Sequence, residues 1–471
     1  MPAAPVNLPW ACGEVQVTPR GAVTLRVSEG PDQLEIALAG ATDLVELFAE
    51  ADVIEHEGIV GDLAVGQRIT VAEHCQLRWV VEVPAEPVAP VRLDITVTAT
   101  PGQALWLWPG GADGFLAVLP ARGAGPVLVV QAIQAELRVA HDWGDGHSLR
   151  LVLTPPGLAA GRRHVVQLKA SVMTGTSGLG ALLPVWFAPT SLAAGEEWSA
   201  PIADLGVEAG PEVTVSHAEG GSMVTLTAPP GLHDVTVHGL RGVTDVVLHV
   251  APPLADVVAT SAEQLLATGE LTSAGALIVQ RALQAGSLRR TAEVEDALDR
   301  FDWTSRADLL AIAFGSERAL VERERAMAAE AVRRISELPT TPGSPRVEVL
   351  AWLAAATLGV TGVPDAAASA PPGSLVRLEQ DILRGRRTSE TPGALAAVVG
   401  RVGAGLPGYL VGLDAIRHAL LIGLLEGVPE GWPEAPSAAV AAQAARQQLL
   451  ACYAGGDLTD VTPLAWLLLG G

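Results

Sequence analysis

Apolar residues recur at every second position through the first part of the chain, and at every third or fourth position through the second part. A period of two is that of a β-strand, and a period between three and four is that of an amphipathic helix. The change falls at residues 250–254, where Ala251-Pro252-Pro253 cannot extend a sheet because proline has no N–H to donate. The pattern therefore predicts a β domain over residues 1–253 and an all-α domain over residues 254–471.

The first part is predicted to be an antiparallel β-sandwich. Segment 91–98 is the clearest example, because its odd positions are all aliphatic and its even positions are Arg, Asp, Thr and Thr. Such alternation is typical of a sheet with one face in water, which favours antiparallel pairing. The many short strands imply one large sandwich or two small ones, with a seam near residues 184–201. Further strands are expected at 22–27, 34–38, 77–83, 105–108, 115–119, 127–131, 149–153, 164–170, 213–216, 223–227, 234–238 and 245–250.

The second part is predicted to consist of about ten or eleven short helices, arranged as helical hairpins in a toroid or a solenoid-like array. Ser261 and Gln264 match a capping box, in which each side chain bonds the other residue's backbone N–H at the start of a helix. Ser344 is expected to cap another helix. One long helix is expected to end at Pro339, and the leucines between 410 and 424 are expected to line a helical face.

Charge and hydropathy restrict the kinds of molecule that the protein is expected to bind. Residues 1–253 hold 12 basic and 27 acidic residues, or −15, and residues 254–471 hold 18 and 25, or −7, which gives −22 for the chain. Such a chain is not expected to bind nucleic acid or an anionic membrane surface. The apolar stretches 347–358 and 409–425 are too short or carry charges, and the first ten residues lack a secretory pattern. We therefore expect a soluble cytoplasmic protein.

Several kinds of chemistry are disfavoured by the motifs that the sequence lacks. Cys12, Cys75 and Cys452 are spaced neither as a metal knuckle nor as a disulfide framework, so buried free thiols are expected. Segment 141–147 has two histidines and two aspartates, but an Asp-Gly turn explains the acids and zinc would need further donors. The signatures of P-loop NTPases, dinucleotide enzymes and common nucleophilic hydrolases do not occur. We expect no bound metal and no cofactor.

Two loops of the helical part combine carboxylates with tryptophan. In one, Glu430 and Glu434 flank Trp432, whose ring could stack on a sugar while one glutamate acts as general acid. The second carboxylate would come from Asp302, because residues on one turn cannot easily flank a substrate from both sides, and the neighbouring Trp303 would add a ligand-binding ring. The alternatives are structural: Trp432 would plug the end of a helix bundle, and Asp302 would cap a helix.

A third candidate lies in the β part. Trp106 and Trp108 share one face if residues 105–108 form a strand, and they could offer an aromatic platform for a ligand at the end of a sheet. The alternative is that both rings pack in the core.

A β-sandwich followed by helical hairpins resembles the layout of glycoside hydrolases and phosphorylases that join a super-sandwich domain to an (α/α)₆ barrel, and of some polysaccharide lyases. The resemblance covers most of the chain and rests on the order of its elements. It implies a general acid on a loop between helices, and Glu430, Glu434 and Asp302 are the positions that match. The helical part is shorter than the barrels of those families, and its loops are short.

Two hypotheses for function follow. The first is a carbohydrate-active or carbohydrate-binding protein, including a degenerate glycosidase-like protein, with its site between the two parts. As an enzyme it would be a glycoside hydrolase or phosphorylase that uses paired carboxylates. The second is a non-enzymatic interaction or assembly scaffold. The expected partner is accordingly a saccharide or another protein. A sugar site would gather acids and aromatic rings in one pocket, whereas a scaffold would expose an apolar patch.

Overall fold

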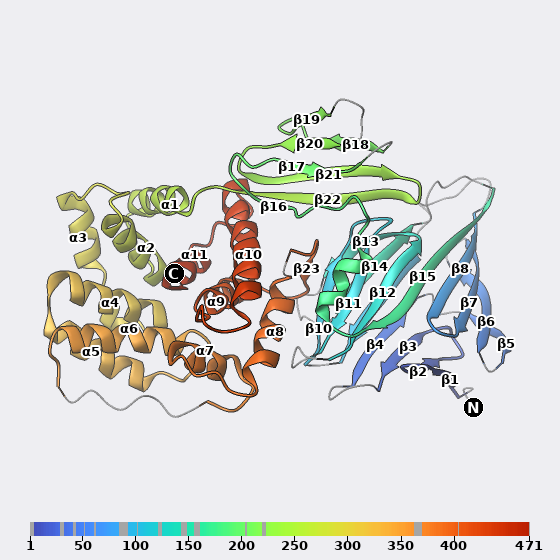
Figure 1. The fold of residues 1–471 in the computed structure, drawn as a ribbon, viewed down its shortest axis with the longest axis horizontal. Helices are drawn as coiled ribbons and strands as arrows, with labels where there is room; N and C mark the ends of the chain where they lie inside the picture. Colours follow the sequence, from blue (N-terminus) through green and yellow to red (C-terminus); the bar gives the residue numbers. More distant parts are fainter. Residues whose placement is uncertain are drawn as a thin grey trace.

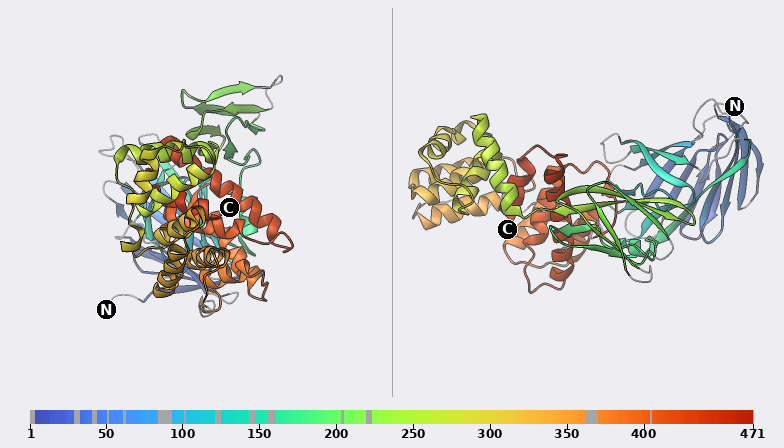
Figure 2. Two further views of the ribbon diagram at one scale, coloured as in Figure 1. Left: turned by 90° about the vertical axis from the view of Figure 1, so that its left-hand side faces the viewer. Right: turned by 90° about the horizontal axis from the view of Figure 1, so that it is seen from above.

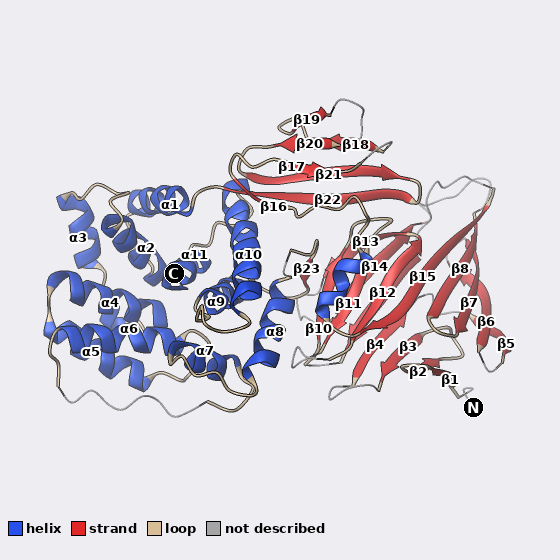
Figure 3. Ribbon diagram, in the orientation of Figure 1, coloured by secondary structure: helices blue, strands red, loops and turns tan. Residues whose placement is uncertain are grey.

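The computed structural model describes residues 4–470 apart from 29–32, 41–43, 51, 61–62, 84–92, 101, 121–124, 143–147, 155–160, 203–204, 219–222, 362–369 and 404. A β part and a helical part form the two ends of an elongated molecule (Figures 1 and 2). Strands reach to Ala251 and helices begin at Leu254, which confirms the predicted fold class. The exceptions among the described residues are the 3₁₀ helix η1 (Thr176–Leu182) and a two-residue strand, Tyr409–Leu410 (Figure 3).

Two large antiparallel sheets form the main sandwich of the β part. The first sheet contains, in spatial order, β1 (Val6–Trp10), β2 (Gly13–Val17), β3 (Val23–Val27), β4 (Leu34–Ala39), β9 (Leu93–Ala99), β14 (Ser148–Thr154) and β13 (Glu136–Asp142). The second contains β23 (Tyr409–Leu410), β10 (Ala104–Trp108), β11 (Phe115–Leu119), β12 (Val127–Gln134), β15 (Arg163–Met173), β8 (Cys75–Glu82), β7 (Leu63–Val71), β6 (Val53–Val60) and β5 (Val45–Ala49). Apolar side chains from both sheets form one shared core.

Two smaller sheets follow in the chain. One contains β16 (Ser191–Ala193), β22 (Gly242–Ala251), β21 (Gly231–Gly239) and β18 (Gly206–Ala209), and the other contains β17 (Trp198–Ala200), β20 (Val224–Thr227) and β19 (Thr214–His217). Strands β16 and β22 are parallel, and the other pairs in these two sheets are antiparallel. Apart from β23, the strands of the large sheets end at Met173, and those of the small sheets begin at Ser191.

Strands β10, β11 and β12 are buried on both faces. Leu105 and Leu107 point into the core of the main sandwich. Trp106 and Trp108, on the opposite face, pack into a second core with residues of the small sheets. This explains why the sequence of β10 and β11 is apolar at almost every position, whereas β9 alternates, since alternation is required only where one face of a sheet meets water.

The described residues of the second part form eleven α-helices, which matches the number expected from the sequence. They are α1 (Leu254–Thr268), α2 (Ser273–Gln284), α3 (Ala292–Arg300), α4 (Leu309–Glu322), α5 (Arg325–Glu337), α6 (Ser344–Thr357), α7 (Leu375–Leu383), α8 (Thr391–Val402), α9 (Ala415–Glu426), α10 (Ala435–Gly455) and α11 (Thr462–Gly470), with the 3₁₀ helix η2 (Trp303–Ser305) between α3 and α4. They share one core that is rich in alanine and leucine. Among the described helices, none combines the length and the apolar character that crossing a membrane requires.

Some helix ends lie at other residues than the local sequence patterns predicted. Ser261 and Gln264 do not cap α1, because this helix already begins at Leu254 and both side chains lie in its middle. Ser344 is the first residue of α6 rather than its cap, and Gly343 precedes it. The long helix predicted before Pro339 is two helices, because Arg323 adopts a left-handed conformation with φ 59° and ends α4.

Candidate functional site

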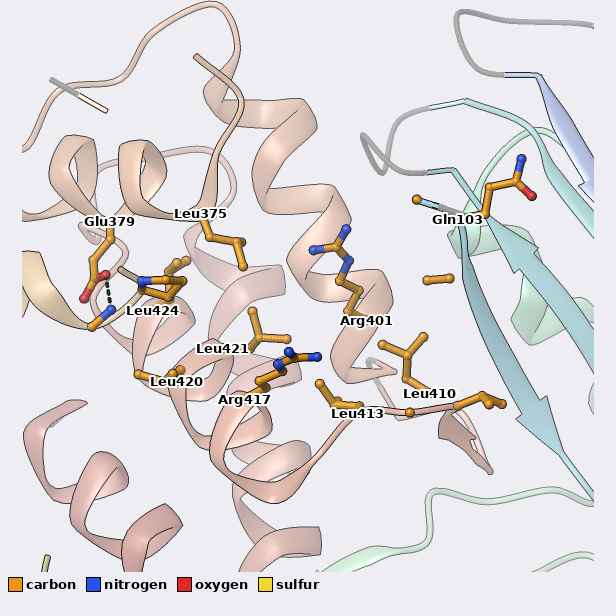
Figure 4. A pocket seen from close by; sticks show the side chains of 16 residues that line it. Gln103, Leu375, Glu379, Arg401, Leu410, Leu413, Arg417, Leu420, Leu421 and Leu424 are labelled. Carbon is orange, nitrogen blue, oxygen red and sulfur yellow. Dashed lines mark hydrogen bonds between the residues drawn. The ribbon is translucent and has the colours of Figure 1, made fainter. Parts of the chain in front are cut away.

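A cavity of about 520 Å³ lies where the helical part meets the nine-stranded sheet. We call it the junction cavity. Figure 4 shows side chains from α7, α8 and α9 on one side of it and Gln103, before β10, on the other. Its lining residues are Gly102, Gln103, Ala104, Pro342, Gly343, Leu375, Glu379, Arg401, Leu410, Val411, Gly412, Leu413, Arg417, Leu420, Leu421 and Leu424.

Strand β23 fixes the position of the cavity relative to the sheet. This strand belongs to the helical part of the chain, yet it pairs with β10, with Leu410 opposite Trp106. The backbone N–H of Val411 donates to the carbonyl of Leu105 over 2.8 Å, and Nε1 of Trp106 donates to the carbonyl of Pro407 over 3.0 Å. A short strand that the sequence pattern cannot reveal therefore joins the two parts.

The loop before β23 approaches the sheet so closely that it requires glycine. A Cβ on Gly403, whose φ is +84°, would lie 2.0 Å from the ring of Trp106. A Cβ on Gly408, whose φ is +92°, would lie 2.1 Å from the carbonyl oxygen of Leu107. Both the conformation and the contact exclude a larger residue at these positions.

Leucines form the apolar wall of the cavity. The leucines between 410 and 424 were predicted to line one helical face, and they do line the same cavity. Only those from 420 onward belong to α9. Asp414 caps this helix by accepting a hydrogen bond from the N–H of Arg417 over 2.7 Å, so Leu410 and Leu413 precede the helix. The shared surface borders the junction cavity.

Glu379 is the only carboxylate among the lining residues that the structure describes. It is buried on α7, and its Oε2 accepts a hydrogen bond from the N–H of Gly343 over 2.8 Å. Nε of Arg346 lies 3.8 Å from its Oε1. Burial raises the pKa of Glu379 above its usual value, and the charge of Arg346 and the backbone N–H groups only partly offset this effect.

Two arginines supply positive charge. Arg401 comes from α8, and burial lowers its pKa, although a guanidinium keeps its proton at neutral pH. Arg417 comes from α9 and is largely exposed, with its Nε 3.4 Å from the carboxylate of Asp414. Figure 4 shows both guanidinium groups between Glu379 and Gln103. Exposed ion pairs are weak, so Arg417 can exchange Asp414 for another anion at little cost.

This arrangement suits recognition of an anion attached to a ring or chain with apolar faces. Guanidinium groups bind carboxylates through paired hydrogen bonds, and the leucines offer apolar contact. The Gln103 amide is already occupied, because it donates to Gln33 and accepts from Glu35. Paired-carboxylate hydrolysis needs two carboxyl groups, and Glu379 has no second carboxylate beside it among the lining residues. Nor do the described residues bring three His, Cys, Asp or Glu side chains together as a metal site.

The structure places the predicted catalytic residues elsewhere. Glu434 precedes α10 and forms two hydrogen bonds with Arg387, over 3.1 and 2.6 Å. These bonds lower the pKa of Glu434, whereas a general acid requires a raised one. Glu430 is exposed to solvent, and Trp432 between them is buried in the helical core, as the structural alternative expected.

Asp302 is not brought together with these glutamates. It lies between α3 and α4, at the end of the helical part that is distant from the β part (Figure 1). Its carboxylate accepts hydrogen bonds from the N–H groups of Thr304 and Ser305, so it caps η2. The hydroxyl of Thr304 is the main cause of its lowered pKa. The following helix α4 is capped by Asp308 instead.

The three remaining tryptophan candidates are buried in the cores. Trp303 packs in the helical core, against Gly315. Trp106 holds the β23 loop as described above. Trp108 makes edge contacts with Phe115 and Phe187 at ring-centroid distances of 5.9 and 5.7 Å. A buried ring offers no platform to a ligand. The loop at 143–147, with its histidine and aspartate, lies outside the described residues.

Sequence patterns did not single out Glu379 or Arg401, because neither stands in a recognisable motif. The one available signal was Arg417, which stands with Asp414 and His418 inside the mostly apolar stretch 409–425. The lining residues come from segments near 102, 342, 375, 401 and 410–424, so only the fold brings them together.

Comparison with known proteins gives a likeness of fold. No family model and no curated protein matches the sequence. Among solved structures, a polysaccharide lyase aligns over 92% of this chain and 74% of its own, with a TM-score of 0.53 and 10% sequence identity. At this identity the likeness concerns the fold alone. It agrees with the layout that the order of β and helical elements suggested.

Proposed function

We propose that this protein binds an acidic saccharide in the junction cavity. The observation that carries the proposal is the placement of Arg401 and Arg417 on one leucine-lined cavity with the buried Glu379. A cavity of about 520 Å³ falls within the range of small-molecule sites and accommodates part of an oligosaccharide. The likeness in fold to a protein named polysaccharide lyase supports a carbohydrate ligand.

The charges explain why the saccharide would be acidic. The chain as a whole carries −22, so nonspecific attraction of anions is weak and a local pair of cations has to provide it. A carboxylate on a sugar ring would accept hydrogen bonds from the guanidinium of Arg417, while the apolar face of the ring would contact the leucines. Glu379 with its raised pKa would donate a hydrogen bond when protonated.

Binding is the function that this geometry supports better than cleavage. Within the described part of the lining there is no histidine, tyrosine, cysteine or serine, and Glu379 is the single carboxylate. A general acid could act here, but it would lack a partner group for a second proton transfer. We therefore describe the site as a saccharide-binding cleft.

Calorimetric titration with tetragalacturonate at low ionic strength tests the proposal. Arg417→Ala should weaken binding by about tenfold, which is the effect of losing one charge-assisted hydrogen-bonding group. Arg417 is exposed, so the variant should fold normally. Arg384→Ala is the matched control, because Arg384 is exposed, directly follows α7 and does not line the cavity.

The two variants lose the same charge, so a general electrostatic effect would weaken binding equally in both. Equal affinities of Arg417→Ala and Arg384→Ala, or no binding by the unmodified protein, would contradict the proposal. Added salt should weaken binding by the unmodified protein, because the contact depends on charge.

A second candidate function, assembly with another copy of the chain, rests on β5. This strand is the outer edge of the nine-stranded sheet, and Val45, Leu47 and Phe48 on it are 64%, 57% and 42% exposed. Ile59, on the neighbouring β6, is 69% exposed. An apolar edge strand offers unpaired backbone groups and apolar surface together, and it pairs readily with another edge.

Light scattering over a range of protein concentrations tests this alternative. A dimer that dissociates on Leu47→Lys, and persists in a lysine variant of the exposed Leu240 on the β21–β22 turn, would support it. A monomer at every concentration would exclude it.

A further inference from the structure

We propose a second saccharide site, for a neutral sugar unit, in a groove beside α1. The groove has a volume of about 370 Å³ and lies between α1 and the turn that follows α10. We call it the α1 groove. None of its lining residues lines the junction cavity, so the two sites are separate and this inference does not rest on the first.

One wall of the groove is a polar stripe on α1. Asp256, Thr260 and Gln264 are spaced by four residues, which places them on one face of the helix, and Ser261 lies beside them. The sequence pattern gave Ser261 and Gln264 a role at a helix start. Because α1 begins at Leu254, these two side chains are free of that role and border the groove instead.

The polar groups of this stripe lack protein partners. Within the described part of the chain, the side chains of Asp256, Thr260, Ser261 and Gln264 form no hydrogen bond and no ion pair. Ser261 is mostly buried, with 8% of its surface exposed, and its side chain borders the groove. A serine in the middle of a helix commonly bonds the carbonyl four residues earlier, and Ser261 does not. These donors and acceptors are therefore available to a ligand.

The opposite wall contains an aromatic ring held in one orientation. The hydroxyl of Tyr453 donates to the carbonyl of Asp460 over 2.7 Å and accepts from the N–H of Leu464 over 3.1 Å. Thr459 adds another hydroxyl on this side. A fixed ring offers a flat apolar surface, against which the C–H face of a pyranose packs without loss of side-chain freedom.

The lining chemistry selects a neutral, hydroxyl-rich ligand. It provides one carboxylate acceptor in Asp256, several hydroxyls that both donate and accept, and one amide in Gln264. The described residues that line the groove include no lysine, arginine or histidine, so an anionic ligand would meet Asp256 without a compensating cation. The α1 groove and the junction cavity would thus hold different kinds of sugar unit.

Titration with methyl glycosides of glucose, galactose, mannose and N-acetylglucosamine, and with cellobiose and maltose, tests the proposal. Binding is followed by saturation-transfer NMR at millimolar ligand. We expect at least one of these probes to bind, and Gln264→Ala and Thr260→Val to weaken it by about three- to tenfold, as expected for losing one hydrogen bond. Both residues are exposed, so folding should be unaffected.

Glu263→Ala is the matched control, because Glu263 is exposed on α1 and does not line the groove. It should bind the probe as the unmodified protein does. Absence of binding by every probe, or equal weakening by Glu263→Ala, would overturn the proposal. Arg417→Ala should leave binding of the neutral probe unchanged, so failure of one site is distinguishable from failure of the other.

Discussion

Acid should destabilise the fold through two partly buried histidines near the junction. His249 lies on β22 and His418 on α9, and burial lowers the pKa of each imidazole to about 4. The charge of His249 lowers the pKa of His418 as well. Nδ1 of His249 and Nε2 of His418 are buried and have no hydrogen-bond partner, so a proton gained at either nitrogen would find no acceptor in place.

The size of the effect follows from the difference in pKa between the folded and unfolded chain. An unfolded histidine titrates near 6.5, so between pH 6.5 and about 4 the unfolded chain binds more protons than the folded chain. The stabilising contribution is therefore complete above pH 6.5, declines as the pH falls, and is lost below about pH 4. Between pH 7.5 and pH 5 the loss amounts to about 2 kcal/mol for each imidazole.

Urea unfolding at these two pH values checks the argument. We expect His418→Gln, which cannot take up a proton, to lose about 2 kcal/mol less than the unmodified protein between pH 7.5 and pH 5. His217→Gln is the matched control, because His217 is exposed on β19 and should make no difference. A His418→Gln protein with the same pH dependence as the unmodified protein would refute the reasoning.

Two further variants test the packing around the junction cavity. Gly408→Ala would place a Cβ 2.1 Å from the carbonyl oxygen of Leu107, at a φ of +92°, and should destabilise the protein by about 1–3 kcal/mol in urea unfolding, whereas Gly431→Ala, which meets nothing within 4 Å, should not. Trp106→Leu removes the hydrogen bond to Pro407 and should cost about 3 kcal/mol and speed proteolysis of the loop before β23; unchanged stability and proteolysis would show that this ring does not hold the two parts together.

The layout was predictable because it depends on local periodicity. A strand presents alternate residues to alternate faces, so segments such as 149–153 and 164–170 matched β14 and β15 closely. The prolines after Ala251 marked the change to helix for a similar local reason.

The errors arose where tertiary contacts decide the conformation. Strand β23 has two residues and exists because β10 lies beside it. The break between α4 and α5 depends on the left-handed conformation of Arg323, which is rare for arginine and carries no sequence signature. The capping box predicted in α1 was wrong. Ser261 and Gln264 have the residue types of such a box, but the helix already begins at Leu254.

The site was hardest to predict, because carboxylates and tryptophans near each other in sequence need not share a cavity. Trp432 is buried in the helical core, and the carboxylate of Glu434 accepts a hydrogen bond from Arg387. The residues around Glu379 and Arg401 belong to helices that come together only when the chain folds. Whether a charged side chain can bind a ligand depends on its burial and on the protein groups that already pair with it. Neither property can be read from the sequence of a loop.

The central claim is that the junction cavity recognises a carboxylate on a saccharide. The most direct measurement compares the affinity of the unmodified protein for tetragalacturonate with its affinity for the fully methyl-esterified tetrasaccharide, which has the same rings without the charge. We predict that the acid binds about tenfold or more tightly than the ester, because only a carboxylate pairs with the guanidinium groups of Arg401 and Arg417. Equal affinity for the acid and the ester would contradict the account.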